Sequence, residues 1–264
     1  MLKKSELVKI KAEVCKVAEG AGKILLSYYR KKLIIKEKFK AGLVTQADLK
    51  SEKFIKAALQ KKFPSFVFIG EESGQSDLIH GDTPVWHVDP LDGTTNFVHG
   101  FPMFCVSIGL AIAGDPVLGV IHIPCLKETF HAAKGSGAFL GKKKIHVSDR
   151  KKISECLLTT GFAYSQEESM LAPAIEKFHN AHLEARAVRR PGAAAIDLAY
   201  VAAGVFDGFW EQNLGSWDIC AGAALVTEAG GEVSNYRNDP LDLMGREVLA
   251  TNGIIHPRMM EILK

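Results

Sequence analysis

The spacing of hydrophobic residues along the chain predicts two helices followed by a region of strands. Apolar side chains recur at three- and four-residue intervals over 5–30 and 47–62, the spacing of amphipathic helices. Short apolar runs at 66–69 and 85–88 predict buried strands. From 103 to 133, apolar runs are separated by turn sequences, so we expect an antiparallel meander there.

After a basic turn at 141–144, the pattern alternates between strands and helices. Strands are predicted at 157–160, 207–211, 232–235 and 248–251, and helices at 168–182, 193–203, 217–229 and 256–263. We therefore divide the chain into an α+β part, 1–145, and a more regular α/β part, 146–264. Because no Pro- or Ser-rich linker separates the two parts, we expect them to pack as one unit.

The composition excludes several classes of protein. The 264 residues are 47% hydrophobic and 24% charged, which is typical of a folded globular chain and not of a disordered one. The net charge of +3 is too small to indicate nucleic acid as the main ligand. The Lys-rich segment 1–62 is most simply a solvated helix face, with nucleic acid or a membrane surface as the alternative.

The cysteines and the longest apolar runs bear on the cellular compartment. The 5 cysteines include no CxxC pair, which predicts free thiols and not a disulfide framework. The N-terminus has no apolar signal-peptide core, and the most apolar stretch, about 103–113, is too short to span a bilayer. We therefore expect a cytoplasmic protein that has no membrane span.

The first candidate site is the sequence WHVDPLDGTTNF. A strand is expected to end at Asp89, where Pro90 bends the chain and Gly93 permits a tight turn. Asp89 and Asp92 can then converge, with the backbone carbonyl of Leu91 between them. Oxygen ligands of this kind suit Mg²⁺.

The same segment continues into a predicted helix that begins at Thr94 and Thr95. The first N–H groups of a helix attract anions such as phosphate, so one segment would supply metal ligands and a phosphate-binding turn. The alternative is an Asx turn that caps a helix. The histidines His87, His99 and His122 form no ligand set, and we expect them to be packing or surface residues.

Three further segments place acids beside glycines or helix starts. Glu71 and Glu72 follow the predicted strand at 66–69. Asp218 lies in the first turn of one predicted helix, and Asp48 lies near the start of another. Each has a simpler interpretation. Glu71 and Glu72 could form a solvated acidic loop, Asp218 could be an acid favoured by the helix dipole, and Asp48 could be a helix cap.

Together these four segments resemble the inositol monophosphatase family of Mg²⁺-dependent, lithium-sensitive phosphatases. The resemblance covers Asp48 to Gly231 and is most specific in the sequences WHVDPLDGTTNFVHG and WDICAGAALVTEAGG. It implies a mixed α/β (α+β) fold, a five-layer αβαβα sandwich, and usually a homodimer. The implied reaction is hydrolysis of myo-inositol monophosphates by a metal-activated water, with no phosphoenzyme.

The resemblance also implies metal ligands. Two or three Mg²⁺ ions are expected in the site. Glu71 and Asp89 would hold the first ion, with the Leu91 carbonyl and the Thr94 hydroxyl nearby. Asp89, Asp92 and Asp218 would hold the second ion, which Li⁺ would replace.

The remaining catalytic roles come from the same resemblance. Asp48 would hydrogen-bond Thr94 and help it to accept the proton of the attacking water. Backbone N–H groups at Gly93, Thr94 and Thr95 would bind the phosphoryl oxygens. Glu72 would have a supporting role.

The substrate is expected to contact the second part of the chain. Gly192, Ala194 and Glu211 match the family's inositol-facing residues position by position, and Asp218 is also expected to contact the substrate. Ala193 departs from the Ser or Thr often found at its position, and alanine has no hydroxyl that could contact the ring.

Other substrates and partners stay open at this point. Relatives in the family act on fructose 1,6-bisphosphate, NADP⁺, histidinol phosphate or phosphoadenosine nucleotides, and loop differences decide between these small phosphate monoesters. A lysine near the site in some members could correspond to Lys36 or Lys38. Some bacterial relatives contact RNA polymerase or RNA without catalysis, and the Lys-rich segment keeps this alternative open.

Overall fold

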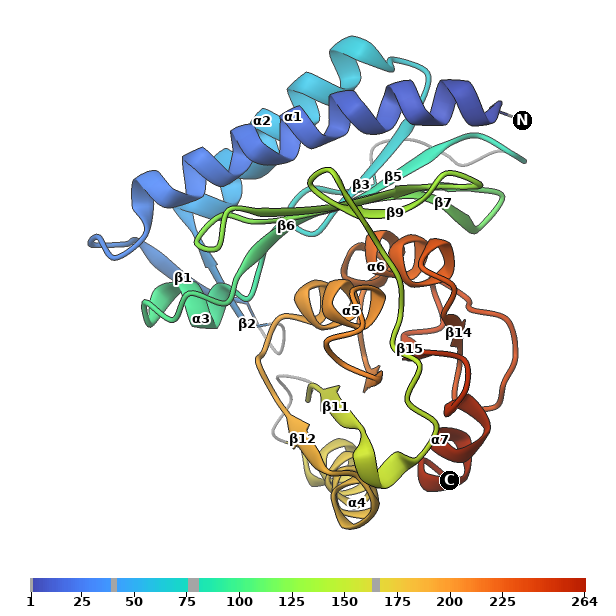
Figure 1. The fold of residues 1–264 in the computed structure, drawn as a ribbon. Coiled ribbons are helices and arrows are strands. Elements are labelled where there is room, and N and C mark those ends of the chain that lie inside the picture. The colour runs from blue at the N-terminus through green and yellow to red at the C-terminus, as the bar shows by residue number, and fades with distance from the viewer. Residues whose placement is uncertain (1, 39–41, 76–80, 163–166) are drawn as a thin grey trace.

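The computed structural model describes residues 2–38, 42–75, 81–162 and 167–264. Figure 1 shows five layers in which helices and sheets alternate. The first layer consists of helices α1 (Lys4–Tyr28) and α2 (Gln46–Lys62), which cover the outer face of the first sheet. Helices α5 (Ala194–Ala202) and α6 (Ser216–Glu228) lie between the two sheets. Helices α4 (Glu168–Glu184) and α7 (His256–Ile262) cover the far side of the second sheet. The predicted αβαβα sandwich is confirmed.

The first sheet has eight strands in the order β10-β9-β8-β7-β6-β5-β3-β4. Their bounds are β3 (Val67–Gly70), β4 (Gly74–Gln75), β5 (Val85–Asp92), β6 (Cys105–Ile112), β7 (Asp115–Ile123), β8 (Glu128–Ala133), β9 (Gly137–Leu140) and β10 (Lys143–Ile145). All neighbours are antiparallel except β3 and β5. The meander predicted for 103–133 is therefore confirmed.

The second sheet has five strands in the order β12-β11-β13-β15-β14. Their bounds are β11 (Leu157–Thr160), β12 (Ala187–Arg189), β13 (Gly208–Gln212), β14 (Glu232–Ser234) and β15 (Glu247–Thr251). Strand β11 is parallel to both β12 and β13, and the other pairs are antiparallel. The four strands predicted after the basic turn are present within one or two residues of their expected bounds.

Several short elements were not predicted. They are the hairpin of β1 (Ile35–Lys38) and β2 (Gly42–Thr45), the strands β4, β9, β10 and β12, and the 3-10 helix η1 (Ile153–Glu155). Each has two to four residues, too few to show a periodic pattern, so the pairing partner and not the local sequence decides them. The short helix α3 (Thr94–Val98) begins at the expected residue.

Strand β5 shows how the core is divided between the two faces of the first sheet. Trp86 and Val88 are buried against α1 and α2, in one hydrophobic cluster. His87 and Asp89 alternate with them along the strand and are also buried, at 4% and 3% exposure. Because successive side chains of a strand point to opposite faces, these two polar residues face the layer of α5 and α6.

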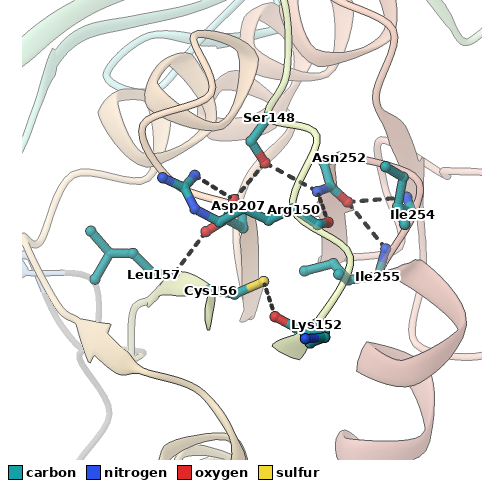
Figure 2. Close-up of polar contacts among 9 residues, drawn as sticks. All are labelled: Ser148, Arg150, Lys152, Cys156, Leu157, Asp207, Asn252, Ile254 and Ile255. Atoms are coloured by element: carbon teal, nitrogen blue, oxygen red, sulfur yellow. Dashed lines mark hydrogen bonds and ion pairs between the residues drawn. The ribbon is translucent and has the colours of Figure 1, made fainter. Parts of the chain in front are cut away.

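The segment that joins the two sheets is held by a buried polar network (Figure 2). Asp207 is fully buried and accepts hydrogen bonds from the Ser148 hydroxyl, from Arg150 at 3.1 Å and from the Leu157 N–H at 2.7 Å. Asn252 donates to the Ser148 hydroxyl at 3.0 Å and to the Arg150 carbonyl at 2.9 Å. The network fastens residues 148–157 to the second sheet.

The five cysteines are free thiols, as the sequence predicted. Among the helices of the described ranges, none combines the length and the apolar character that a membrane crossing requires.

Candidate active site

An irregularity in β5 brings two aspartates to the same face of the first sheet. The strand does not end at Asp89, as predicted, but continues to Asp92, with a register shift between the two residues. In a regular strand, residues three apart point to opposite faces. A bulge adds an extra residue to one strand, and so it lets Asp89 and Asp92 both face α5 and α6. Ser51 supports the bulge by donating to the Pro90 carbonyl at 2.9 Å.

Backbone N–H groups fix one oxygen of each of three aspartates. The Leu91 N–H donates to Asp89 Oδ1 at 2.8 Å, and the Ala195 N–H donates to Asp92 Oδ2 at 2.8 Å. At the start of α6, the Gly215 N–H donates to Asp218 Oδ2 at 2.7 Å. Asp218 thus lies in the first turn of α6, where the helix dipole favours an acid, and the contact with the Gly215 N–H engages only one of its carboxylate oxygens.

These carboxylates perturb one another. Burial raises the pKa of Asp89 well above its ordinary value, and the charges of Glu71, Asp92 and Asp218 raise it further. Burial is also the first cause that raises the pKa of Asp92, to about 7, and that of Asp218. The three aspartates thus have raised pKa values because they are buried and because other acids, Glu71 among them, lie close to them.

A hydroxyl group lies beside these acids and is oriented by two acceptors. Thr94 Oγ1 lies 3.1 Å from Asp48 Oδ1 and 3.0 Å from the Leu91 carbonyl oxygen, and it can donate its proton to either. Asp48 is held in turn by the N–H of Thr45 at 2.8 Å and by the Thr45 hydroxyl at 2.6 Å. Asp48 thus completes the capping box of α2, whose N-cap is Thr45, and is also a partner of Thr94, so it has both roles that the sequence left open.

The loop after β3 carries Glu71 into the same place. The Glu71 N–H donates to the Val88 carbonyl at 3.1 Å, which extends the ladder between β3 and β5. The next N–H, that of Glu72, donates to Glu52 Oε2 at 2.9 Å. Glu52 is buried at 4% exposure and was not identified from the sequence, because its only signal is an acid on the apolar face of α2.

The opposite wall of the site comes from the second part of the chain. Gly192 has a φ of +86°, a backbone conformation that favours glycine. Asn96 joins this loop to α3, because its side chain donates to the carbonyls of Met103 at 2.7 Å and Pro191 at 2.9 Å. Asn96 was also missed, since an asparagine in a helical turn has no distinguishing pattern.

Glu211, in β13, lines the same cleft. Burial, and to a smaller extent the charge of Asp92, raise its pKa to about 8, and Arg190 opposes the shift. A β-carbon at Gly161 would overlap the Glu211 carboxylate, so the glycine leaves room for this side chain.

These groups line one cleft of about 760 Å³, a volume typical of small-molecule sites. Ten predicted site residues line it: Glu71, Asp89, Leu91, Asp92, Gly93, Thr94, Gly192, Ala194, Glu211 and Asp218. Asp48, Thr95 and Lys36 are not among the lining residues, and the Lys38 side chain lies outside the described residues. Asp48 reaches the cleft through Thr94.

The donor set fits a hard divalent cation. Every candidate ligand is an oxygen, from carboxylates or from the Leu91 carbonyl, and Mg²⁺ prefers such ligands. Across 2–38, 42–75, 81–162 and 167–264, no three His, Cys, Asp or Glu side chains already form a compact ligand cluster. Like charges repel, however, and a cation between the acids would offset the repulsion that raises their pKa values.

Comparison with known proteins identifies the family that this chain resembles. A model of the inositol monophosphatase family matches residues 6–264. An inositol-1-monophosphatase from Synechocystis sp. is 44% identical over 246 residues, which are 92% of this chain and 85% of that protein. An inositol-1-monophosphatase from Caulobacter vibrioides is 39% identical, over 88% of this chain and 91% of its own length.

Solved structures agree with the sequence comparison. The inositol monophosphatase from Anabaena superposes with a TM-score of 0.88 at 39% identity, and covers 97% of this chain and 96% of its own. The extragenic suppressor protein suhB from Bartonella henselae superposes with a TM-score of 0.90 at 39% identity, over 97% and 98% of the two chains.

Proposed function

The chain belongs to the inositol monophosphatase family, and from that premise we propose that it hydrolyses myo-inositol monophosphates to inositol and phosphate. One observation carries the proposal: three buried aspartates with raised pKa values line a cleft together with Glu71 and with a hydroxyl group that is already oriented. A phosphate dianion is repelled by such a cleft unless cations accompany it. The acids and the substrate therefore both require a metal.

We propose Mg²⁺ as the cofactor, with two or three ions in each site. Glu71, Asp89, Asp92 and Asp218 would hold the ions, together with the Leu91 carbonyl. Each aspartate has one oxygen fixed by a backbone N–H, so the other oxygen is the one expected to bind a cation. When bound, Mg²⁺ would supply a nucleophilic water and neutralise charge on the phosphate.

The residues of the chain would orient and deprotonate that water. When the Thr94 hydroxyl donates to Asp48, its lone pairs are free to accept a hydrogen bond from water, and as Thr94 takes the proton of the water its own proton would pass to the Asp48 carboxylate. The N–H groups at Gly93, Thr94 and Thr95 would bind phosphoryl oxygens, because the first N–H groups of a helix have no acceptor within it.

Glu211 and the Gly192 loop would bind the leaving group. Glu211 accepts hydrogen bonds when ionised and donates one when protonated, so it can pair with ring hydroxyls in either state. Ala194 and the neighbouring Ala193 line the cleft with methyl groups. We infer that ring recognition depends on Glu211 more than on this loop.

Phosphate release from inositol 1-phosphate, measured with Mg²⁺ and with a chelator, tests the proposal. We expect release that the chelator abolishes, and the absence of release under either condition would refute the assignment. A panel containing fructose 1,6-bisphosphate, NADP⁺, histidinol phosphate and a phosphoadenosine nucleotide identifies the preferred leaving group. If one of these is hydrolysed faster than inositol 1-phosphate, the phosphatase assignment stands and the substrate assignment does not.

Two finer properties of the family are also proposed for this chain. Lithium ions at millimolar concentration should inhibit by replacing the ion held by Asp89, Asp92 and Asp218, and unchanged release in Li⁺ would contradict this. A homodimer is expected in solution, and light scattering after gel filtration would reveal a monomer if that is wrong.

A further inference from the structure

Helix α6 lies directly on the backbone of the first sheet, at two glycines that pair across neighbouring strands. Gly109 of β6 pairs with Gly119 of β7. A β-carbon at Gly109 would stand 2.8 Å from the Ala221 nitrogen. At Gly119 it would overlap the Ala221 carbonyl oxygen and stand 2.8 Å from the carbonyl carbon. The missing side chains therefore fix how closely the middle of α6 approaches the sheet.

Two buried side chains of the sheet hold the first turn of α6. His87 Nδ1 is hydrogen-bonded to Ser216 Oγ at 2.8 Å, and Ser107 Oγ donates to the Trp217 carbonyl at 3.1 Å. His87, Ser216 and Ser107 are exposed by only 4%, 4% and 0%. Both contacts join residues more than 100 positions apart in the chain.

On the sheet, both contacts are close to Asp89. His87 is two residues before Asp89 on β5, and Ser107 is the register partner of Asp89 on β6. On the helix, Ser216 and Trp217 immediately precede Asp218, whose carboxylate is fixed by its own helix start. The hydrogen bonds thus connect the strand that carries Asp89 to the turn that carries Asp218.

We propose that His87 and Ser107 are positioning residues, which set the distance between Asp218 and the aspartates of β5 by fastening the first turn of α6 to the sheet. The inference rests on the proposed function, because it treats Asp218 as a ligand of Mg²⁺. Asp218 is the one acid of the proposed ligand set that comes from the second part of the chain. Its position relative to the others depends on docking and not on local sequence.

A purely structural role is the competing explanation, and a matched pair of serines separates the two. Ser234 of β14 is also buried, at 3% exposure, and its hydroxyl is hydrogen-bonded to the buried His256 at 2.9 Å. Ser234 does not line the cleft. Ser216→Ala and Ser234→Ala therefore remove the same kind of hydrogen bond from two places, only one of which adjoins a proposed metal ligand.

The experiment is a Mg²⁺ titration of the metal-stripped full-length protein, in which the unfolding temperature is measured at each Mg²⁺ concentration. The value without Mg²⁺ reports stability, and its dependence on Mg²⁺ concentration reports affinity. Both variants should lower the unfolding temperature without Mg²⁺, because each removes the serine partner of one ring nitrogen of a buried histidine. Ser216→Ala should also weaken Mg²⁺ binding by about 3- to 10-fold, the range expected for loss of one ordinary hydrogen bond. Ser234→Ala should keep wild-type affinity.

Two further variants make every outcome decisive. Ser107→Ala should weaken Mg²⁺ binding independently, whether or not Ser216→Ala folds well. If both variants bind Mg²⁺ as Ser234→Ala does, the positioning role is wrong. Asp218→Asn tests the premise: if it binds Mg²⁺ like the wild type, the ligand assignment in the proposed function fails. If Asp218→Asn loses affinity and the serine variants keep it, only the positioning inference is refuted.

Discussion

The close approach of α6 to the first sheet makes Gly119→Ala a sharp test of the packing argument. The added β-carbon would overlap the Ala221 carbonyl oxygen, a backbone atom that is already committed inside α6. It cannot move unless the helix moves as a unit. Overpacking a well-packed interior costs about 1–3 kcal/mol and more where a backbone must shift, so we expect about 3 kcal/mol here.

The expected signal follows from the size of the chain. For a protein of this length, a loss of 1 kcal/mol lowers the unfolding temperature by about 2–4 °C, so Gly119→Ala should lower it by about 6–12 °C. Differential scanning calorimetry of the metal-free protein measures this directly. Because α6 carries Asp218, we also expect the folded Gly119→Ala protein to bind Mg²⁺ more weakly than the wild type.

Gly20→Ala is the matched control. Its β-carbon would also be too close to a neighbour, at 2.7 Å, but that neighbour is the ring of Phe54, which is 39% exposed and can rotate away. Alanine in the interior of a helix gains about 0.5–1 kcal/mol over glycine, which offsets the rearrangement. The control should unfold within about 4 °C of the wild type. If Gly119→Ala behaves like Gly20→Ala, the helix does not rest on the sheet as described.

Three other variants test the site and its support. Asp92→Asn should reduce phosphate release by at least about a hundredfold, with an unchanged circular dichroism spectrum, because it removes a proposed metal ligand; a wild-type rate would contradict its role. Asp207→Ala should cost about 2–4 kcal/mol in urea unfolding, because it leaves the Leu157 N–H and its other donors unpaired; unchanged stability would contradict the network in Figure 2. Burial raises the pKa of Glu211 from 4.5 to about 8, so the folded, Mg²⁺-free protein keeps a proton there that the unfolded chain releases. Its contribution to stability therefore falls as the pH rises through that interval, and Glu211→Gln should flatten the fall in unfolding temperature; identical pH profiles would refute the shift.

Local patterns in the sequence determined the long elements and the identity of the acids. Helical spacing over 5–30 and 47–62 gave α1 and α2, because an apolar stripe must be buried whatever packs on it. The acids were recognised because their motifs are short and contiguous. These features depend on residues close together in the chain.

Only the tertiary structure decided how the acids meet. The end of β5 was misplaced because a bulge is a property of two paired strands, and the pairing of Asp92 with Cys105 cannot be read from either strand alone. His87 was expected to be a packing or surface residue, yet it binds Ser216, 129 positions away. A short stretch of sequence determines which chemical groups lie close together along the chain. The distance between Asp89 and Asp218 is instead set by the docking of α6 on the first sheet, because that docking depends on close packing between remote parts of the chain.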